Sequence, residues 1–214
     1  MDSADFQLET PPNLLLVVSG SSGVGKDTVI DRMKQRHCPF AYVVTATTRQ
    51  RRPAEVDGVH YHFFTEERFN EMVAGGRMLE WAKVYGNYYG VPRFAVAEAL
   101  GTGRDVVVKV DVQGAATIRR EVPGALLLYL RPPSVEELER RLRLRQSESA
   151  EEIALRLSKA AQEYRQLPLF DYVLTSHAGR IDDVVAQIMA IVTAEKARVN
   201  PRRVILSDSG ERST

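Results

Sequence analysis

Short hydrophobic runs alternate along the chain with stretches in which apolar residues recur every three or four positions. Aliphatic runs at residues 14–18, 106–110 and 126–130 predict buried strands, and a weaker run at residues 172–174 predicts another. The helical spacing predicts intervening helices, the last of them at about residues 181–199. Strands that alternate with helices form a parallel sheet covered on both faces, so we expect an α/β fold of this kind.

The pattern changes in the middle of the chain. After a short predicted strand at residues 41–45, residues 46–95 show β-like pieces around one predicted helix at residues 66–74, and we interpret this stretch as an inserted lobe. Further on, residues 135–164 form a long arginine-rich region of helical character. The tail from Asn200 onward is expected to be loosely ordered.

A glycine-rich loop follows the first predicted strand directly. Its pattern, G-x-x-x-x-G-K from Gly20 to Lys26, lets several backbone N–H groups point at one anion, and the helix behind it adds its positive end. Lys26 is then placed to reach the β- and γ-phosphates of a nucleoside triphosphate. The predicted triphosphate-binding residues are Gly20, Ser21, Ser22, Gly23, Val24, Gly25, Lys26, Asp27 and Thr28.

Asp27 is irregular, because a Ser or Thr hydroxyl that ligates Mg²⁺ usually follows the lysine of such a loop. A carboxylate here is repelled by a triphosphate unless it faces the metal or turns away. Two interpretations stay open: Asp27 faces the metal, or it is a first-turn residue favoured by the helix dipole while Thr28 supplies the hydroxyl.

Composition narrows the classes of partner. The 29 basic and 28 acidic residues give a net charge of +1, which argues against nucleic-acid and membrane partners. The single cysteine excludes an internal disulfide and fits a reducing compartment. Residues 1–13 carry acidic groups and no basic ones, unlike a signal peptide, and no apolar run is long enough to span a membrane. We expect a soluble, cytoplasmic protein.

Two segments of the inserted lobe carry the side chains that a second phosphate requires. The segments are T-T-R-Q-R-R-P-A-E-V-D-G-V-H-Y-H-F, which ends at Phe63, and E-W-A-K-V-Y-G-N-Y-Y-G, which begins at Glu80. Arginine forks bind phosphate bidentately and tyrosine hydroxyls add donors. With these motifs the chain closely resembles guanylate kinases over about residues 14–198.

The resemblance implies a P-loop NTPase core with an inserted small mixed α/β lobe that binds GMP and a helical lid. The core would comprise residues 14–45 and 96–198, the lobe residues 46–95 and the lid about residues 141–156, with flexible termini at 1–13 and 200–214. The implied activity is transfer of the γ-phosphoryl group of ATP to GMP, and to dGMP, by a monomer or homodimer.

The resemblance also assigns roles to residues. Glu80 matches the carboxylate that accepts hydrogen bonds from guanine N1–H and the 2-amino group, whereas adenine has an acceptor at N1 and no 2-amino group. The implied GMP-binding residues are Thr45, Arg49, Arg52, Glu55, Tyr61, Glu80, Tyr89 and Asp111. The implied catalytic residues are Lys26, Arg49, Arg141, Arg145 and Arg156. Mg²⁺ bound with ATP would be held by Thr28 and Asp111, partly through water.

Three single positions and one short segment depart from the family pattern. Val91 stands where a hydroxyl is common, and Ala54 where a glycine is common. Lys109 replaces a frequent acid, so it must either reach the mouth of the site or pair with a carboxylate. The segment Leu174-Thr175-Ser176-His177 replaces the usual asparagine and aspartate near the adenine.

Two alternatives to GMP kinase activity share the same scaffold. An inactive guanylate-kinase-like interaction domain typically loses the intact loop, whereas this chain retains Gly20, Gly25 and Lys26. A kinase for a phosphorylated sugar has no use for the guanine-reading Glu80.

Overall fold

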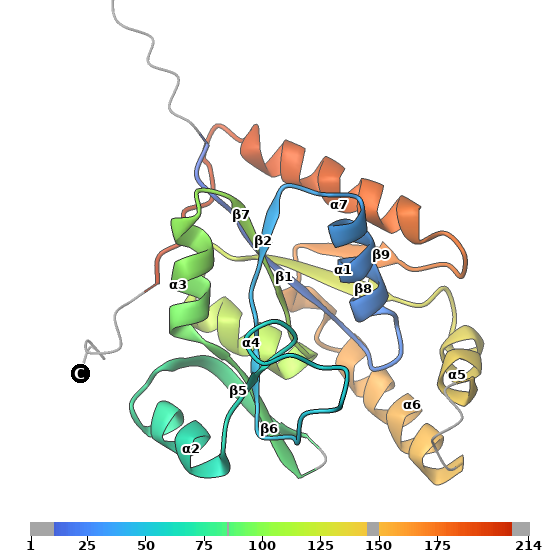
Figure 1. Ribbon diagram of the computed structural model, residues 1–214. Coiled ribbons are helices and arrows are strands. Elements are labelled where there is room, and N and C mark those ends of the chain that lie inside the picture. The colour runs from blue at the N-terminus through green and yellow to red at the C-terminus, as the bar shows by residue number, and fades with distance from the viewer. Residues whose placement is uncertain (1–10, 85, 145–149, 207–214) are drawn as a thin grey trace, which may run out of the picture.

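Five parallel strands form the main sheet, in the order β2-β7-β1-β8-β9 (Figure 1). The computed structural model describes residues 11–84, 86–144 and 150–206. The strands of this sheet are β1 (Leu15–Gly20), β2 (Phe40–Tyr42), β7 (Asp105–Lys109), β8 (Leu126–Arg131) and β9 (Tyr172–Thr175). The predicted α/β fold with a parallel sheet is confirmed.

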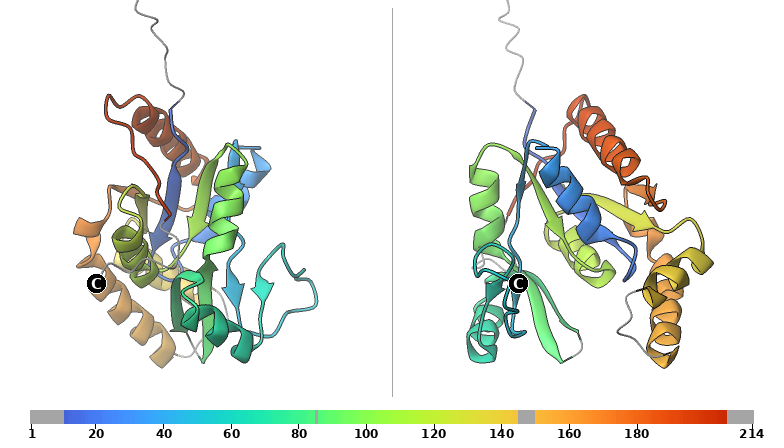
Figure 2. Two further views of the ribbon diagram at one scale, coloured as in Figure 1. Left: turned by 90° about the vertical axis from the view of Figure 1, so that its left-hand side faces the viewer. Right: turned by 45° about the vertical axis from the view of Figure 1, so that its right-hand side comes forward.

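Helices cover both faces of this sheet, as the two views in Figure 2 show. Alternate residues of β1 point to opposite faces, so Leu16 and Val18 pack with α1 and α7, whereas Leu15 and Val17 pack with α3 and α4. Every residue of β1 is buried, which explains why its sequence is a continuous aliphatic run. The helices are α1 (Lys26–Gln35), α3 (Arg93–Gly101), α4 (Val112–Glu121) and α7 (Ile181–Lys196).

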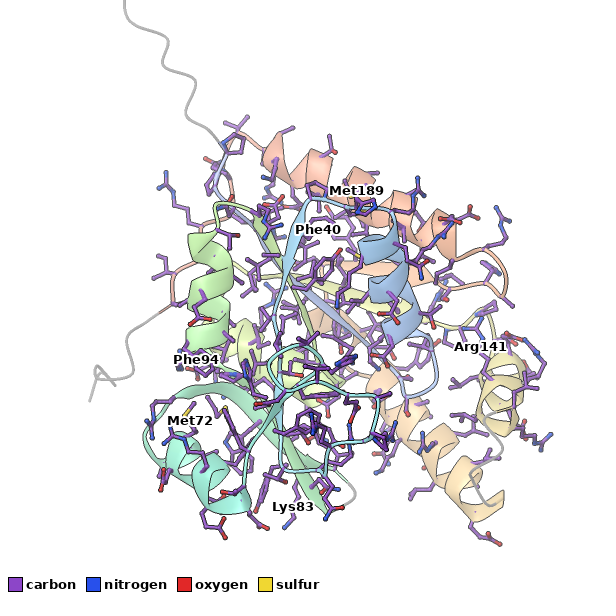
Figure 3. The ribbon with its side chains drawn as sticks, viewed as in Figure 1. Phe40, Met72, Lys83, Phe94, Arg141 and Met189 are labelled. Carbon is purple, nitrogen blue, oxygen red and sulfur yellow. The ribbon has the colours of Figure 1, made fainter. Side chains whose placement is uncertain are left out.

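A second, four-stranded sheet has the order β4-β3-β6-β5 and carries α2 on one side. Its own small core contains Ala46, Phe69, Met72 and Met78, of which Met72 is labelled in Figure 3. The elements are β3 (Ala46–Thr47), β4 (His62–Phe63), α2 (Glu66–Ala74), β5 (Met78–Val84) and β6 (Asn87–Pro92). These elements lie within the predicted inserted lobe, and α2 has the predicted bounds.

The arginine-rich region contains two helices, α5 (Val135–Arg143) and α6 (Ala150–Tyr164), which pack against each other. Their shared core is Leu138, Leu142, Ile153 and Ala160. The short 3₁₀ helix η1 (Leu167–Leu169) leads from α6 to β9. None of the helices in the described ranges is long and apolar enough to cross a membrane.

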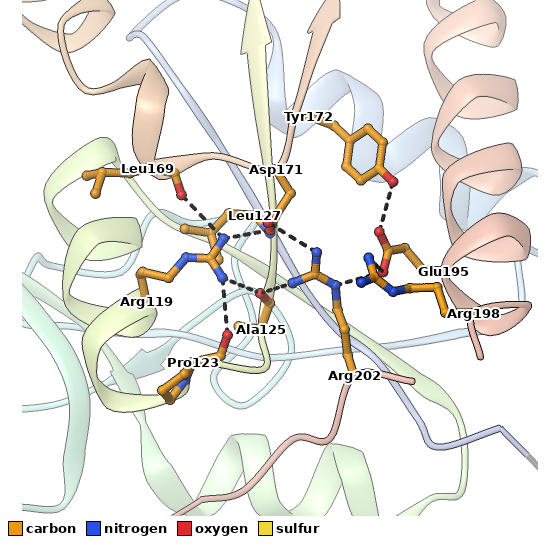
Figure 4. Close-up of polar contacts among 10 residues, drawn as sticks. All are labelled: Arg119, Pro123, Ala125, Leu127, Leu169, Asp171, Tyr172, Glu195, Arg198 and Arg202. Carbon is orange, nitrogen blue, oxygen red and sulfur yellow. Dashed lines mark hydrogen bonds and ion pairs between the residues drawn. The ribbon is translucent and has the colours of Figure 1, made fainter. Parts of the chain in front are cut away.

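A polar network connects the chain beyond α7 to the amino-terminal ends of β8 and β9 (Figure 4). The Arg202 guanidinium donates to Glu195 Oε2 at 2.7 Å and to Asp171 Oδ1 at 3.1 Å. Asp171 also accepts from Arg119 Nη2 at 2.6 Å, and the Tyr172 hydroxyl donates to Glu195 Oε1 at 2.8 Å. The prediction of a loose tail from residue 200 is therefore wrong for residues 200–206, because Arg202 reaches carboxylates that the sequence pattern did not connect to it.

Three further elements differ from the sequence prediction. The pattern did not indicate α3, whose alanine-rich sequence has a weak polar face. The strand expected at residues 41–45 is β2, at residues 40–42. The last helix ends at Lys196, three residues before the predicted end.

Candidate functional site

The loop between β1 and α1 has the backbone conformation that a phosphate cradle needs. Gly20, Gly23 and Gly25 have positive φ angles of 139°, 88° and 102°, which other residues rarely adopt. A Cβ atom at Gly20 would lie 2.2 Å from the carbonyl oxygen of Leu130. The glycine spacing of the motif is therefore required by the turn itself and by its contact with β8.

Lys26, the first residue of α1, folds back over this loop. Its Nζ donates to the carbonyl oxygens of Gly20 at 2.5 Å and Ser21 at 3.1 Å. Burial lowers the pKa of Lys26 to about 8, although the carboxylates of Glu163 and Asp27 act in the opposite direction. A cation held inside a ring of backbone groups is placed to meet an anion that enters the loop.

The predicted arginines and tyrosines of the small lobe meet at one point. Arg49 forms a two-pronged ion pair with Glu55, at 3.1 and 2.7 Å, and its guanidinium lies 5.6 Å from the centre of the Tyr61 ring. The Tyr61 and Tyr89 rings are 6.2 Å apart, edge to face. Glu55 also accepts from the backbone N–H of Arg52 at 2.8 Å. Glu55 thus fixes the arginine side chain and the loop behind it.

These contacts explain the charge state of Glu55. The hydrogen bonds from the Arg49 side chain, followed by the one from the Arg52 backbone, lower the pKa of Glu55 to about 2. The carboxylate is therefore ionised at any physiological pH, and the Arg49 guanidinium keeps a fixed orientation.

Glu80 lies on β5 with its carboxyl group nearly buried, at 7% exposure. Burial, together with the nearby Asp111 carboxylate, raises the pKa of Glu80 to about 8. A Cβ atom at Gly114 would lie 2.6 Å from Glu80 Oε2, so glycine at this position makes room for the carboxyl group. Asp111 caps α4 by accepting from the N–H of Gly114 at 2.7 Å.

Three cavities connect the loop with this lobe. One of about 610 Å³ lies between the loop, β5 and α6 and includes Lys26 and Asp111. It shares both residues with a cavity of about 320 Å³ that includes Glu80 and Thr45. A third, of about 510 Å³, contains Arg49, Arg52 and Glu55, and shares Thr45, Tyr61, Tyr89 and Lys109 with the second. All the predicted GMP-binding residues, together with Gly20, Ser22, Lys26 and Asp27 of the loop, therefore line one continuous depression, whereas Ser21, Gly23, Val24, Gly25, Thr28, Arg141 and Arg156 are not among its lining residues.

The predicted lid arginines differ in their positions. Arg156 on α6 donates to the Ser22 hydroxyl at 2.9 Å, so it reaches the phosphate loop. Arg141 on α5, labelled in Figure 3, donates to the carbonyl oxygens of Val24 at 3.0 Å and Ser176 at 2.7 Å. Arg141 thus joins α5, the loop and the end of β9. Arg145 lies outside the described residues.

Asp27 and Lys109, two irregular positions of the sequence, form an ion pair with each other. Asp27 lies in the first turn of α1, and Lys109 is the last residue of β7. Lys109 fulfils both expectations for it, because it pairs with a carboxylate and also lines the cavities. Thr28 is exposed on the same turn of α1.

Sequence reasoning missed Glu163. Burial raises the pKa of this residue of α6, although the Ser21 side chain acts in the opposite direction. Its Oε2 atom is buried and has no hydrogen-bond partner among the described residues. The Ser21 hydroxyl is also within 3.0 Å of the Tyr129 hydroxyl. No spacing motif marked Glu163, because only the packing of α6 brings it to the loop.

The positions that depart from the family pattern have simple surroundings. Val91 is completely buried in the core beneath the main sheet, so it serves packing. Ala54 is exposed in the turn before Glu55. Ser176 is buried, at 3% exposure, whereas His177 is exposed.

A glycine-rich loop between the first strand and first helix of a parallel sheet defines a P-loop nucleotide-binding protein. The sequence matches the model of the guanylate kinase family over residues 13–195. The chain belongs to the guanylate kinase family.

Individual relatives support this membership. The guanylate kinase of Carboxydothermus hydrogenoformans is 39% identical over 191 residues, which cover 89% of this chain and 92% of that protein. That of Symbiobacterium thermophilum is 42% identical over 191 residues, with 88% of each chain covered. The crystal structure of guanylate kinase from Anaplasma phagocytophilum has a TM-score of 0.70 and 28% sequence identity, and the match covers 89% of each chain.

Proposed function

We propose that this protein transfers the γ-phosphoryl group of ATP to GMP, and to dGMP, and produces ADP and GDP. One observation carries the proposal: Lys26 of the phosphate loop, the arginine–tyrosine cluster around Arg49 and the buried Glu80 line one continuous depression. A triphosphate in the loop and a monophosphate at the cluster would then approach each other inside it. Membership of the guanylate kinase family supports the same reaction.

The acceptor side has groups suited to a nucleoside monophosphate with guanine as its base. Arg49, Arg52, Tyr61 and Tyr89 would bind the phosphate, since guanidinium forks and phenol hydroxyls donate to its oxygens. Glu80, once ionised, would accept from guanine N1–H and the exocyclic amine. Adenine has an acceptor at N1 and would leave a buried carboxylate unpaired, which selects against AMP.

The donor side would hold ATP with Mg²⁺. The carboxylates that act on the pKa of Lys26 are those of Glu163, Asp27 and Asp111, and Asp27 is paired with Lys109. The Thr28 hydroxyl lies on the first turn of α1. Such oxygen donors fit Mg²⁺, which proteins typically bind through one or two carboxylates plus substrate phosphates. Among the described residues, no three His, Cys, Asp or Glu side chains form a group that could hold a metal ion. We propose that the ion arrives with ATP, whose phosphates would supply further oxygen ligands. When bound, Mg²⁺ neutralises charge on the β- and γ-phosphate oxygens.

The chemistry then requires positioning and charge rather than a strong base. The attacking oxygen of the GMP phosphate is already anionic, so no proton has to be removed. Lys26 and the arginines would hold the two phosphate chains in line and stabilise the charge that spreads over the transferred group. The site would exclude water when the lobe and the lid close over the core, because water otherwise competes for the phosphoryl group. In this proposal the lobe is residues 46–95, the lid about residues 141–156, and the core residues 14–45 and 96–198. We place this activity in the cytoplasm.

The test is a coupled assay of ADP release with GMP, dGMP, AMP, UMP and ribose bisphosphate as acceptors. We expect turnover with GMP and dGMP and little with the other compounds. Turnover with ribose bisphosphate alone would identify a sugar-phosphate kinase. Lack of turnover with every acceptor, in protein that still binds GMP, would identify an interaction domain.

A further inference from the structure

Lys109 lies where the two predicted phosphate sites meet. It ends β7, next to β1 in the centre of the sheet, where Val18 is its partner in register. The carboxyl ends of parallel strands face the site in such folds, so Lys109 is delivered beside the phosphate loop. Its side chain is 28% exposed, and its Nζ lies 5.9 Å from the centre of the Tyr61 ring.

The cavities place Lys109 between donor and acceptor. Among the described residues, Thr45, Tyr61, Tyr89 and Lys109 line both the cavity that contains Lys26 and the cavity that contains Arg49. Lys109 is the charged residue of these four. A cation at this boundary faces the position through which a phosphoryl group must pass.

The irregular residues at positions 27 and 109 depend on each other. Phosphate loops usually have a hydroxyl at position 27, and the resemblance often gives an acid at position 109, whereas this chain has Asp27 and Lys109 in contact. An acid at position 109 would place two carboxylates together, and a serine at position 27 would remove the partner of the lysine. The chain therefore carries a cation at position 109 together with the anion that holds it.

The surroundings of the Asp27–Lys109 ion pair would allow a phosphate to replace Asp27 as the partner of Lys109. Burial lowers the pKa of Lys109, but the Asp27 carboxylate and the Tyr61 hydroxyl outweigh it, so the pKa is raised and the ammonium stays charged. The Asp27 side chain is 72% exposed. Water can therefore solvate Asp27 when a phosphate replaces it as the partner of Lys109.

We propose that Lys109 is a further catalytic residue of this protein, which binds the phosphoryl group in transit, and that Asp27 holds Lys109 in position before the phosphates enter. The proposal rests on the proposed function, since it concerns the same transfer site. Lys26 would bind the donor phosphates, Arg49 the acceptor phosphate, and Lys109 the group between them. A charge aimed at the transferring group acts most strongly in the transition state.

The test compares Lys109→Met with Lys109→Arg and with a matched control, Lys196→Met. Lys196 is similarly exposed, at 31%, and pairs with Asp105 at the opposite end of the same strand. We expect Lys109→Met to lower kcat at least ~10-fold, the arginine variant to recover most of the activity, and Lys196→Met to keep kcat within about 2-fold. Equal kcat values for Lys109→Met and wild type would overturn the proposal.

A binding measurement separates a catalytic role from a structural one. In a dinucleoside pentaphosphate with adenosine at one end and guanosine at the other, the phosphate chain would span the donor and acceptor sites and pass beside Lys109. Lys109→Met should weaken this compound at least ~10-fold but change the affinities for ADP and GMP by less than about 3-fold. Equal losses for all three compounds would show that the lysine only supports the fold.

Charge exchange tests the coupling with Asp27. Lys109→Asp should be the least active variant, because it faces the Asp27 carboxylate, and Asp27→Ser added to it should recover at least ~5-fold in kcat. No recovery in the double variant would overturn the coupling. If the wild-type protein releases no ADP in the presence of GMP, the proposed function itself is overturned. If the wild-type protein is active and Lys109→Met is equally active, only the role of the lysine is overturned.

Discussion

The pKa of Glu80 predicts that GMP binding depends on pH and releases a proton. Burial and the Asp111 carboxylate raise this pKa to about 8, so the carboxyl group is mostly protonated at pH 7 before GMP binds. Guanine presents two hydrogen-bond donors, N1–H and the exocyclic amine. If Glu80 were protonated, its O–H group would face one of these N–H groups, and two donors would meet without an acceptor. GMP must therefore bind the ionised form, and its apparent affinity falls as the pH falls below the pKa of Glu80.

The magnitude follows from the populations. With a pKa of about 8, roughly 9% of the carboxyl groups are ionised at pH 7 and roughly 76% at pH 8.5. The dissociation constant of GMP should thus rise about 8-fold from pH 8.5 to pH 7, equivalent to ~1.3 kcal/mol. The same populations predict release of about 0.9 proton per bound GMP at pH 7 and about 0.2 at pH 8.5.

Isothermal titration calorimetry with GMP alone, in two buffers of different ionisation enthalpy, measures both quantities. Glu80→Gln is the control, because its amide does not titrate, and the phosphate of GMP titrates equally in both proteins. We expect the variant to bind GMP more weakly by roughly 2–4 kcal/mol and to lose the pH dependence attributed to Glu80. The same pH slope and proton release in both proteins would refute the reasoning, since the titrating group would then lie elsewhere.

Three other substitutions test separate parts of the structure. Lys26→Met should lower kcat at least ~10²-fold in the coupled assay while calorimetry finds GMP affinity within about 2-fold of wild type, because it removes a cation from the donor phosphates. Arg156→Ala should lower kcat more than it raises the KM for GMP, since Arg156 reaches Ser22 on the donor loop; unchanged steady-state kinetics would mean a surface role. Arg202→Ala should leave kcat at 25 °C unchanged but lower the free energy of unfolding by ~2–3 kcal/mol, because Glu195 is 2% exposed and loses its closest cation. Differential scanning calorimetry would then record a Tm about 4–10 °C lower, and an unchanged Tm would contradict the role of the network.

The elements nearest to the phosphate loop were predictable because their causes are local. The continuous aliphatic run of β1 follows from burial on both faces, and the positive φ angles at Gly20 and Gly25 require glycine there. The lobe was predictable for a different reason. Its motif brings Arg49 and Glu55 within six residues of each other, so their ion pair is itself a local contact.

The contacts that escaped prediction connect distant parts of the chain. Glu163 lies more than 130 positions from Lys26, and only the packing of α6 makes their charges interact. Arg202 reaches Asp171, 31 positions earlier in the chain, by the same kind of long-range contact, and composition alone therefore made the tail look loose. Periodicity reports which face of an element is apolar, but it does not report which polar side chains meet across elements.

The strand β7 shows how one kind of ion pair serves two purposes. At its amino-terminal end, Asp105 is 9% exposed and accepts from Lys196 and from the Leu14 backbone, each at 2.9 Å, so this pair is held by the surrounding chain. At its carboxyl end, Lys109 pairs with an aspartate that is 72% exposed. Because water reaches the Asp27 carboxylate, its attraction to Lys109 is partly screened, and on the proposed role of Lys109 a phosphate with its higher charge would displace Asp27. The pair with the more exposed carboxylate lies beside the cavities, where the proposed role of Lys109 requires a phosphate to replace Asp27.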